Sequence, residues 1–343
     1  MVGLNSPFGN PCCEISGPEI SACLFSGEVS STAASTSGYR IVTEACGLLD
    51  RSQRGKLALT GSETKSFLQG QVSNDIESLT PGEGCYAAFL TPKGKMLGDL
   101  RVLDAGDELL LDTERSALQE LFNMIRRFRI GFDVELHKRT VERGLVSLIG
   151  PAATEIAGVP DLPAAEHAHR PLELDGVPVR AIRTDVGVDL LCRSEDTEAL
   201  IGVLTERGAE PVGEEIAECL RIERGRPRYG LDLDESVIPQ EAGLNDRAVS
   251  FTKGCYVGQE TVARLFYRGK PNRRLRGLRL TASASPGAEV VLGDRTVGHL
   301  ASTAVSPRLG PIGLALIRRE AEPGATVRVG DDGASATVVE LPF

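Results

Sequence analysis

The feature that most constrains the fold is a pattern of strand, glycine and helix that occurs twice along the chain. Residues 56–68 and residues 145–156 each contain an apolar strand, a glycine shortly after it, and a helix that follows at once. Each unit leads on to a further strand and helix, over residues 109–127 and 188–207. Hairpins lie between these elements, so we interpret the pattern as an α+β fold with two related split βαβ lobes. Chance similarity of two α+β segments is the alternative interpretation.

Acidic and hydroxyl side chains stand before the last helix of each unit. They are Asp-Thr-Glu at residues 112–114 and Ser-Glu-Asp at residues 194–196. Such side chains accept hydrogen bonds from free helix N–H groups and suit the positive end of the helix dipole. We therefore predict that both triplets cap helices.

The character of the sequence changes after Pro271. Short apolar stretches alternate there with glycine and proline, at residues 277–280, 290–292, 296–300, 313–317, 326–329 and 336–341. This spacing predicts a small C-terminal β-barrel. We predict three regions: a flexible N-terminal extension over 1–40, the two lobes over 41–270, and the barrel over 271–343.

Composition limits the classes of function. The net charge is −10, whereas a nucleic-acid-binding protein usually shows a basic balance, so we expect no nucleic-acid partner. No apolar run reaches membrane-spanning length, and the 8 cysteines form no CxxC pair. We expect a cytoplasmic protein without membrane contact. His167 and His169 have no third ligand at useful spacing, so we predict loop histidines and no metal site.

The segment at residues 253–260, KGCYVGQE, carries the densest chemistry. Two glycines flank Cys255 and Tyr256, and a helix is expected to begin at Gln259. A helix N-terminus and the nearby Lys253 both lower the pKa of a thiol, which makes Cys255 a candidate reactive thiol. The alternative is that Cys255 is a small buried side chain, as most free cysteines are.

A basic run follows this segment, from Arg264 to Arg279, with Phe266 and Tyr267 inside it. Such a run could hold a polyanion such as a polyglutamate tail, a phosphate or RNA. A solvated linker is the competing interpretation.

The KGCYVGQE segment resembles the K-G-C-[FY]-x-G-Q-E signature of YgfZ-type proteins, which are relatives of the glycine-cleavage T-protein. Residues 220–225, LRIERG, are similar to a T-protein stretch, and residues 228–230 fall where that relative has Leu-Tyr-Gly. Residues 91–102, TPKGKMLGDLRV, resemble the hairpin of its first domain. The resemblance covers about residues 40–343.

The resemblance implies two related α+β lobes with a barrel, and tetrahydrofolate bound in a central opening. It implies that Cys255 is the functional thiol, with Lys253 beside it, and that partners are iron–sulfur client enzymes or the cluster-assembly machinery. Carboxylate, aromatic and basic side chains suit the parts of a folate. The residues that we expect to contact folate are Asp99, Arg221, Arg228, Tyr229, Glu241, Tyr256, Gly258, Gln259 and Glu260.

Two departures from the T-protein pattern bear on catalysis. The hairpin keeps one acid, Asp99, preceded by Gly98, and the TGYTGE-type turn has no match at residues 183–189. We therefore expect a tetrahydrofolate-binding accessory protein that supports iron–sulfur cluster assembly or repair, and indirectly tRNA modification. The alternatives are a folate-dependent aminomethyltransferase with Asp99 catalytic, and an RNA-binding factor that uses the basic run.

Overall fold

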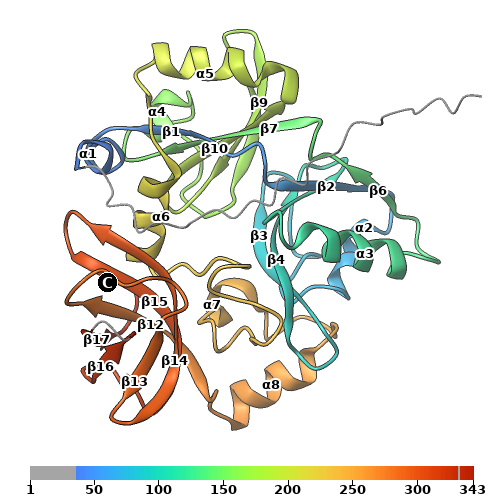
Figure 1. The fold of residues 1–343 in the computed structure, drawn as a ribbon. Helices are drawn as coiled ribbons and strands as arrows, with labels where there is room; N and C mark the ends of the chain where they lie inside the picture. The colour runs from blue at the N-terminus through green and yellow to red at the C-terminus, as the bar shows by residue number, and fades with distance from the viewer. Residues whose placement is uncertain (1–35, 331–332) are drawn as a thin grey trace, which may run out of the picture. The chain divides into compact units, whose positions relative to one another are not determined.

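The computed structural model describes residues 36–330 and 333–343. Two open sheets and one closed barrel contain the strands of these residues, and Figure 1 shows each sheet with its covering helices. Within the described residues, no helix is long and apolar enough to cross a membrane.

The first lobe is a five-stranded antiparallel sheet with the strand order β3-β4-β5-β2-β6. Its apolar side chains pack with those of two helices into one core. The elements are β2 (Gly55–Thr60), α2 (Thr64–Gln69), β3 (Gly84–Leu90), β4 (Met96–Asp104), β5 (Leu109–Thr113), α3 (Leu118–Phe128) and β6 (Glu135–Lys138).

The second lobe is a six-stranded sheet with the order β11-β1-β7-β10-β9-β8, in which only β1 and β11 pair in parallel. A separate apolar core lies beneath its helices. The elements are β1 (Gly47–Asp50), β7 (Arg143–Ile149), α4 (Ala153–Ile156), β8 (His169–Leu174), β9 (Val177–Arg183), β10 (Gly187–Arg193), α5 (Thr197–Glu206) and β11 (Glu210–Pro211).

The two sheets share one pairing plan, which confirms the predicted pair of related lobes. In the first lobe β2 pairs with β5, β5 with β4, and β4 with β3. In the second lobe β7, β10, β9 and β8 pair in the same succession. Along the chain, α2 follows β2 and α3 follows β5 in the first lobe. In the second lobe α4 follows β7 and α5 follows β10 in the same way. The strand–glycine–helix repeat in the sequence is therefore the trace of a repeated topology.

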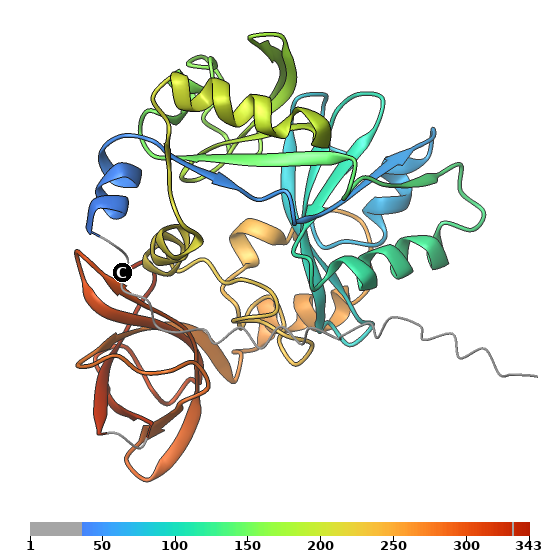
Figure 2. The same ribbon diagram turned by 45° about the horizontal axis from the view of Figure 1, so that its top comes forward.

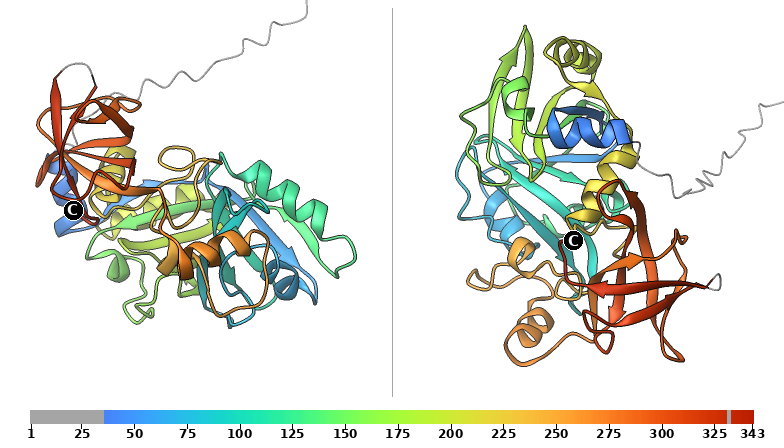
Figure 3. Two further views of the ribbon diagram at one scale, coloured as in Figure 1. Left: turned by 90° about the horizontal axis from the view of Figure 1, so that it is seen from below. Right: turned by 90° about the vertical axis from the view of Figure 1, so that its left-hand side faces the viewer.

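The predicted barrel is a closed six-stranded one with the order β12-β15-β14-β13-β16-β17 (Figure 3). Helix α6 (Glu214–Glu223) packs between α1 (Thr36–Glu44) and β14, and so links the lobes to the barrel (Figure 2). The barrel strands are β12 (Arg273–Leu280), β13 (Glu289–Leu292), β14 (Arg295–Ser306), β15 (Gly310–Arg318), β16 (Thr326–Val329) and β17 (Ala334–Val339). Helices α7 (Asn245–Ala248) and α8 (Gln259–Arg268) precede it.

Three local predictions need revision. Strand β5 continues through Thr113 and α3 begins only at Leu118, so residues 112–114 do not cap that helix. Residues 194–196 form a 3₁₀ turn before α5, with no side-chain cap. Helix α1 begins at Thr36, inside the segment expected as an extension, and residues 1–35 lie outside the described residues.

Candidate functional site

Two adjoining cavities, of about 160 and 180 Å³, lie where the sheets of the two lobes meet the segment before the barrel. They share five lining residues and so adjoin each other, and together we call them the Asp99 cavity. The shared residues are Arg51, Arg54, Tyr86, Asp99 and Arg247.

Asp99 stands on β4 and is 4% exposed. Tyr86, on the paired strand β3, donates a hydrogen bond of 2.6 Å from its hydroxyl to Oδ2 of Asp99. Burial raises the pKa of the Asp99 carboxyl to about 6, although the hydrogen bond from Tyr86 lowers it. A carboxyl that titrates near neutrality can both accept and release a proton under ordinary conditions, which is the property of a general acid–base group.

Gly98 points away from this cavity. A Cβ atom built on it would lie 2.6 Å from the ring of Phe89 and 2.7 Å from Cβ of Ala117. Successive residues of a strand face opposite sides of the sheet, so position 98 faces the apolar core and position 99 faces the cavity. The absence of an adjacent acid therefore does not remove a group from the Asp99 cavity.

A second carboxylate enters the cavity from the segment before β8. Glu166 forms an ion pair with Arg247, whose guanidinium also lies 4.5 Å from the centre of the Tyr86 ring. Although burial opposes it, the pairing with Arg247 lowers the pKa of Glu166. This carboxylate was not predicted from the sequence, because it lies far along the chain from Asp99.

A network of charged side chains lines part of the cavity and connects the two lobes. Arg101 on β4 donates 2.7 Å and 2.6 Å hydrogen bonds to Asp189 of the second lobe and Asp112 of the first. Arg54 also pairs with Asp112 at 2.8 Å, and the Ser147 hydroxyl donates to Asp189 at 2.6 Å. Arg101 is 7% exposed. Buried ions of this kind are tolerated only when their partners are present.

His167 and His169 are buried, at 7% and 3% exposure. His167 lies in a turn, as predicted for a loop histidine, whereas the prediction is wrong for His169, which belongs to a strand. His169 begins β8, whereas His167 lines the Asp99 cavity. No group of three or more potential ligands for a metal ion occurs among residues 36–330 and 333–343.

The other end of the cavity contains three of the predicted folate contacts. Arg221 donates to Asp232 at 2.7 Å and to Ser302 at 2.7 Å. Arg228 forms ion pairs with Glu114, Glu214 and Glu218, at 2.9–3.1 Å. Tyr229 is 9% exposed, and burial raises its pKa to about 12. All three line the cavity, but both arginines are already paired with acids of the protein.

A larger cavity of about 620 Å³ continues from the first. It shares Thr184, Asp185 and Val186 with the Asp99 cavity, so residues of the stretch that lacks a TGYTGE-type turn form the boundary. Asp185 at this boundary accepts a 3.0 Å hydrogen bond from Nε of Arg226.

The motif residue Lys253 anchors the KGCYVGQE segment to the first lobe. Its Nζ donates to three backbone carbonyls, those of Gln69, Val72 and Asn74, which follow or end helix α2. The side chain is buried, and burial lowers its pKa to about 8. With all three donors engaged by the first lobe, Lys253 holds the motif in place and has no donor left for a thiol.

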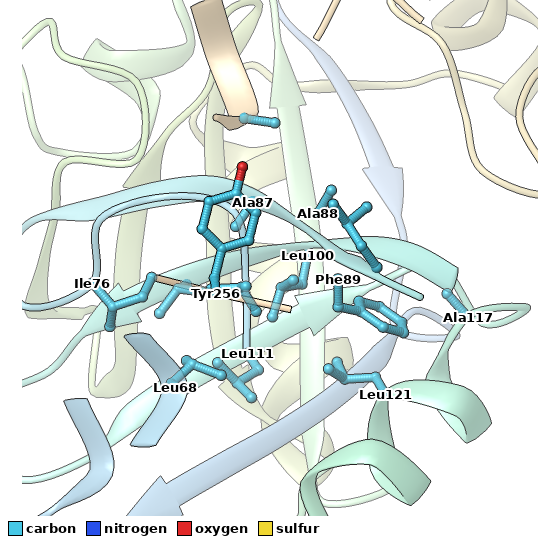
Figure 4. Packing of buried hydrophobic residues seen from close by; sticks show 14 of the residues in the cluster. Leu68, Ile76, Ala87, Ala88, Phe89, Leu100, Leu111, Ala117, Leu121 and Tyr256 are labelled. Atoms are coloured by element: carbon cyan, nitrogen blue, oxygen red, sulfur yellow. The ribbon is translucent and has the colours of Figure 1, made fainter. Parts of the chain in front are cut away.

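Tyr256 and Gly258 of the motif also contact protein. Figure 4 shows Tyr256 among core side chains that include Leu68, Ile76 and Ala87. Gly258 has a φ of 86°, and a Cβ on it would lie 2.6 Å from the carbonyl oxygen of Thr91. Both residues therefore fasten the motif to the first lobe and the tip of its hairpin.

Cys255 is exposed, which excludes the buried interpretation. Helix α8 begins at Gln259, as predicted. Neither Cys255, Gln259 nor the exposed Glu260 is among the residues that line the cavities. The thiol and the titratable carboxyl therefore occupy different places.

Two arginines of the basic run that lie on the first barrel strand, β12, form ion pairs, one of them with Glu241. Arg273 lies 3.0 Å from Glu241, and Arg276 pairs with Glu340. Phe266 stacks on Phe251 with ring centres 3.8 Å apart. The structure places Glu241 outside the Asp99 cavity.

The Asp99 cavity fits the pterin end of a reduced folate. Ligand sites usually enclose roughly 300–1,000 Å³, and the two adjoining cavities together reach the lower end of that range. Oδ1 of Asp99 accepts no hydrogen bond from the described residues, and both ring nitrogens of His167 are buried without a partner there. These groups match the N–H and carbonyl groups of a pterin edge.

Comparison with known proteins agrees with this architecture. Residues 21–253 match the model of the GCVT N-terminal domain, and residues 273–343 match that of the glycine cleavage T-protein C-terminal barrel domain. The crystal structure of glycine cleavage system aminomethyltransferase T from Bartonella henselae has the same fold, with a TM-score of 0.79 over 90% of this chain and 88% of that one, at 22% identity.

Two curated relatives are similar over most of their length. A protein of Arabidopsis thaliana named "Putative transferase At1g60990, chloroplastic" is 31% identical over 86% of this chain and 71% of its own. An aminomethyltransferase of Rubrobacter xylanophilus is 31% identical over 89% of this chain and 85% of its own. From these matches and the fold, the chain belongs to the glycine cleavage T-protein family.

Proposed function

We propose that this protein binds a reduced folate in the Asp99 cavity and catalyses aminomethyl transfer to it. The observation that carries this proposal is the buried Asp99 carboxyl, whose pKa of about 6 suits proton transfer at neutral pH. The relatives named as aminomethyltransferases support it. It was the alternative in the sequence analysis, and the core-facing direction of Gly98 removes one argument against it.

A bound tetrahydrofolate would supply the amine nitrogens that accept the one-carbon unit. Asp99, as the carboxylate, accepts the proton that leaves such a nitrogen, while Tyr86 fixes the carboxylate through Oδ2 and leaves Oδ1 for the ligand. In the complete transfer two folate nitrogens would each form a bond to the one-carbon unit and lose a proton. One proton would end on the amine that leaves as ammonia, and the other on the sulfur of the lipoyl carrier as its bond to the one-carbon unit breaks, so the transfer needs no oxidant or reductant. Arg247, which lies over the Tyr86 ring, keeps the hydroxyl in position.

The YgfZ-type accessory role is a second candidate, which the exposure of Cys255 favours. Of the cysteines among residues 36–330 and 333–343, Cys46, Cys192 and Cys219 are buried and Cys85 is half-buried, whereas Cys255 is open to solvent. An exposed thiol is available to an iron–sulfur client or to the assembly machinery. Failure of Cys255→Ala to restore a cluster-dependent enzyme in a deletion strain would support this role.

The direct test supplies an aminomethylated lipoyl carrier and tetrahydrofolate, and measures methylene-tetrahydrofolate. Wild-type protein should turn over, and Asp99→Asn should lower kcat by about 10²–10⁴-fold, the usual contribution of a general acid–base group. No product from wild-type protein under any folate concentration that saturates binding would overturn the proposal.

A stability control separates loss of catalysis from loss of folding. Because burial raises the pKa of Asp99, its stabilising contribution is present below the ordinary value of 3.8 and is lost as pH rises through about 6. At pH 8 the ionised carboxyl opposes folding, so Asp99→Asn should unfold at the same temperature as wild type or higher. Calorimetric melting at pH 8 measures this.

A further inference from the structure

His167, in the segment before β8, and His169, the first residue of β8, differ in whether their ring nitrogens have hydrogen-bond partners. His169 is fully engaged, because Nε2 lies 3.1 Å from the Glu83 carbonyl oxygen and Nδ1 lies 2.9 Å from the Arg180 guanidinium. His167 is almost as deeply buried, yet neither of its ring nitrogens has a hydrogen-bond partner within the described part of the chain. Leaving a buried polar group unpaired costs about 1–3 kcal/mol, and native structures rarely do so without a reason.

The backbone holds His167 in an unusual conformation. Its φ is 72°, in the left-handed region that residues other than glycine seldom occupy. Two backbone bonds to β9 fix it there: its N–H donates to the Arg183 carbonyl at 2.9 Å, and the Arg183 N–H donates to the Ala168 carbonyl at 2.8 Å. Such conformations persist where the surroundings over-determine them, and they cluster at ligand sites.

The position of the ring indicates what it can contact. His167 lines the same cavity as Asp99 and Glu166. Its Nε2 lies 3.6 Å from Oε1 of Glu166, which is beyond a good hydrogen bond. Burial, reinforced by Arg101, lowers the pKa of His167 to about 3, so the ring is neutral at physiological pH. A neutral imidazole offers one donor and one acceptor.

We propose that His167 is a ligand-contacting residue of the Asp99 cavity, and that one of its ring nitrogens hydrogen-bonds the pterin end of the bound reduced folate. The inference rests on the proposed function, because it uses the same cavity and ligand. The pterin edge carries both N–H donors and a carbonyl acceptor, so it can satisfy the ring nitrogen that faces it in either tautomer of the neutral imidazole.

The test titrates tetrahydrofolate, and separately tetrahydropterin and p-aminobenzoylglutamate, into wild type, His167→Phe, His167→Asn and His169→Phe by calorimetry. His167→Phe keeps a ring but removes both nitrogens, and should weaken tetrahydrofolate and tetrahydropterin binding by about tenfold or more, since each 1.4 kcal/mol is tenfold. His167→Asn should retain part of the affinity, because asparagine tolerates positive φ and offers a donor and an acceptor. Binding of p-aminobenzoylglutamate should not change.

Melting temperatures distinguish a ligand-contacting role of His167 from a role in stabilising the fold, because a stabilising role would lower the melting temperature of His167→Phe. His167→Phe removes two unpaired polar atoms, which offsets the strain of a phenylalanine at positive φ, so it should melt close to the wild-type temperature. His169→Phe loses two hydrogen bonds and should melt lower while its affinity, measured well below that temperature, stays at the wild-type value.

Two outcomes distinguish this inference from the proposed function. If wild type binds tetrahydrofolate and His167→Phe binds it equally well, the His167 assignment is wrong and the proposed function stands. If wild type binds no reduced folate, both fail. Nitrogen-15 spectra of the wild-type protein add an independent check, since the His167 ring signals should shift on saturation with tetrahydrofolate and those of His169 should not.

Discussion

The Asp99 cavity and the KGCYVGQE segment contrast in how their chemistry is arranged. The segment has the more distinctive sequence, yet Lys253, Tyr256 and Gly258 use their side chains or backbone to fasten it to the first lobe. The cavity is assembled from β3, β4, α7 and the segment before β8, so its residues come from stretches that lie far apart in the sequence. A short conspicuous motif can therefore be a packing motif, with the titratable groups elsewhere.

Arg101→Met should have the largest effect on stability, because it breaks the buried network of ion pairs that lines the cavity. It leaves Asp189 with only the Ser147 hydroxyl and takes one of two cations from Asp112. Removing one partner of a buried ion pair costs about 3–5 kcal/mol, so the free energy of unfolding in urea should fall by that amount.

Arg193→Met is the matched control for Arg101→Met. Arg193 pairs with Glu195 and Asp196 on the surface, and its side chain is 56% exposed. Exposed pairs contribute about 0–1 kcal/mol. Equal losses for the two variants would show that the interior network does not join the lobes energetically.

Lys253→Met should lower the stability by a smaller but still large amount, which would establish that Lys253 anchors the motif to the first lobe. Three backbone carbonyls near the end of α2 lose their charged donor. We expect a loss of about 2–4 kcal/mol in the free energy of unfolding, from buried acceptors left without partners. Lys93→Met, an exposed lysine at the hairpin tip, should change it by less than about 0.5 kcal/mol. If Lys253→Met is as stable as wild type, Lys253 does not anchor the motif.

Cys255→Ala should have the smallest effect. The side chain is exposed and lines none of the described cavities, so stability should change by less than about 0.5 kcal/mol and aminomethyl transfer should stay at the wild-type rate. Cys219→Ala, at a fully buried site, should lose about 1 kcal/mol. Loss of transfer in Cys255→Ala would move the catalytic centre to the motif.

Much of the fold was predictable from sequence because local patterns determine it. Strands such as β7 and β10 are apolar runs bounded by glycine or polar residues, and the barrel strands follow the turn signals after Pro271. The predicted caps at residues 112–114 were wrong because Asp112 and Glu114 are taken by Arg54, a partner that only the folded structure brings close.

The site was only partly predictable. Asp99, Arg228 and Tyr229 line the cavity as expected from residue type and resemblance. Glu166 and His167 were missed, because a histidine in a stretch rich in proline and alanine has the same local sequence whether it faces solvent or a cavity. The signal that identifies His167 is burial without a partner, which is a property of three-dimensional structure alone.

The pH dependence of aminomethyl transfer shows whether proton transfer takes place at Asp99. The groups that set the titration of Asp99 include Tyr86, Glu114, Arg54 and Arg247. If Asp99 is the proton acceptor, kcat rises with pH through a midpoint of about 6, because the carboxylate is the active form. Tyr86→Phe should move this midpoint upward, because the Tyr86 hydrogen bond lowers the pKa of Asp99. A rate that is constant from pH 5 to pH 8, or a midpoint that disappears in Cys255→Ala, would contradict this role of Asp99.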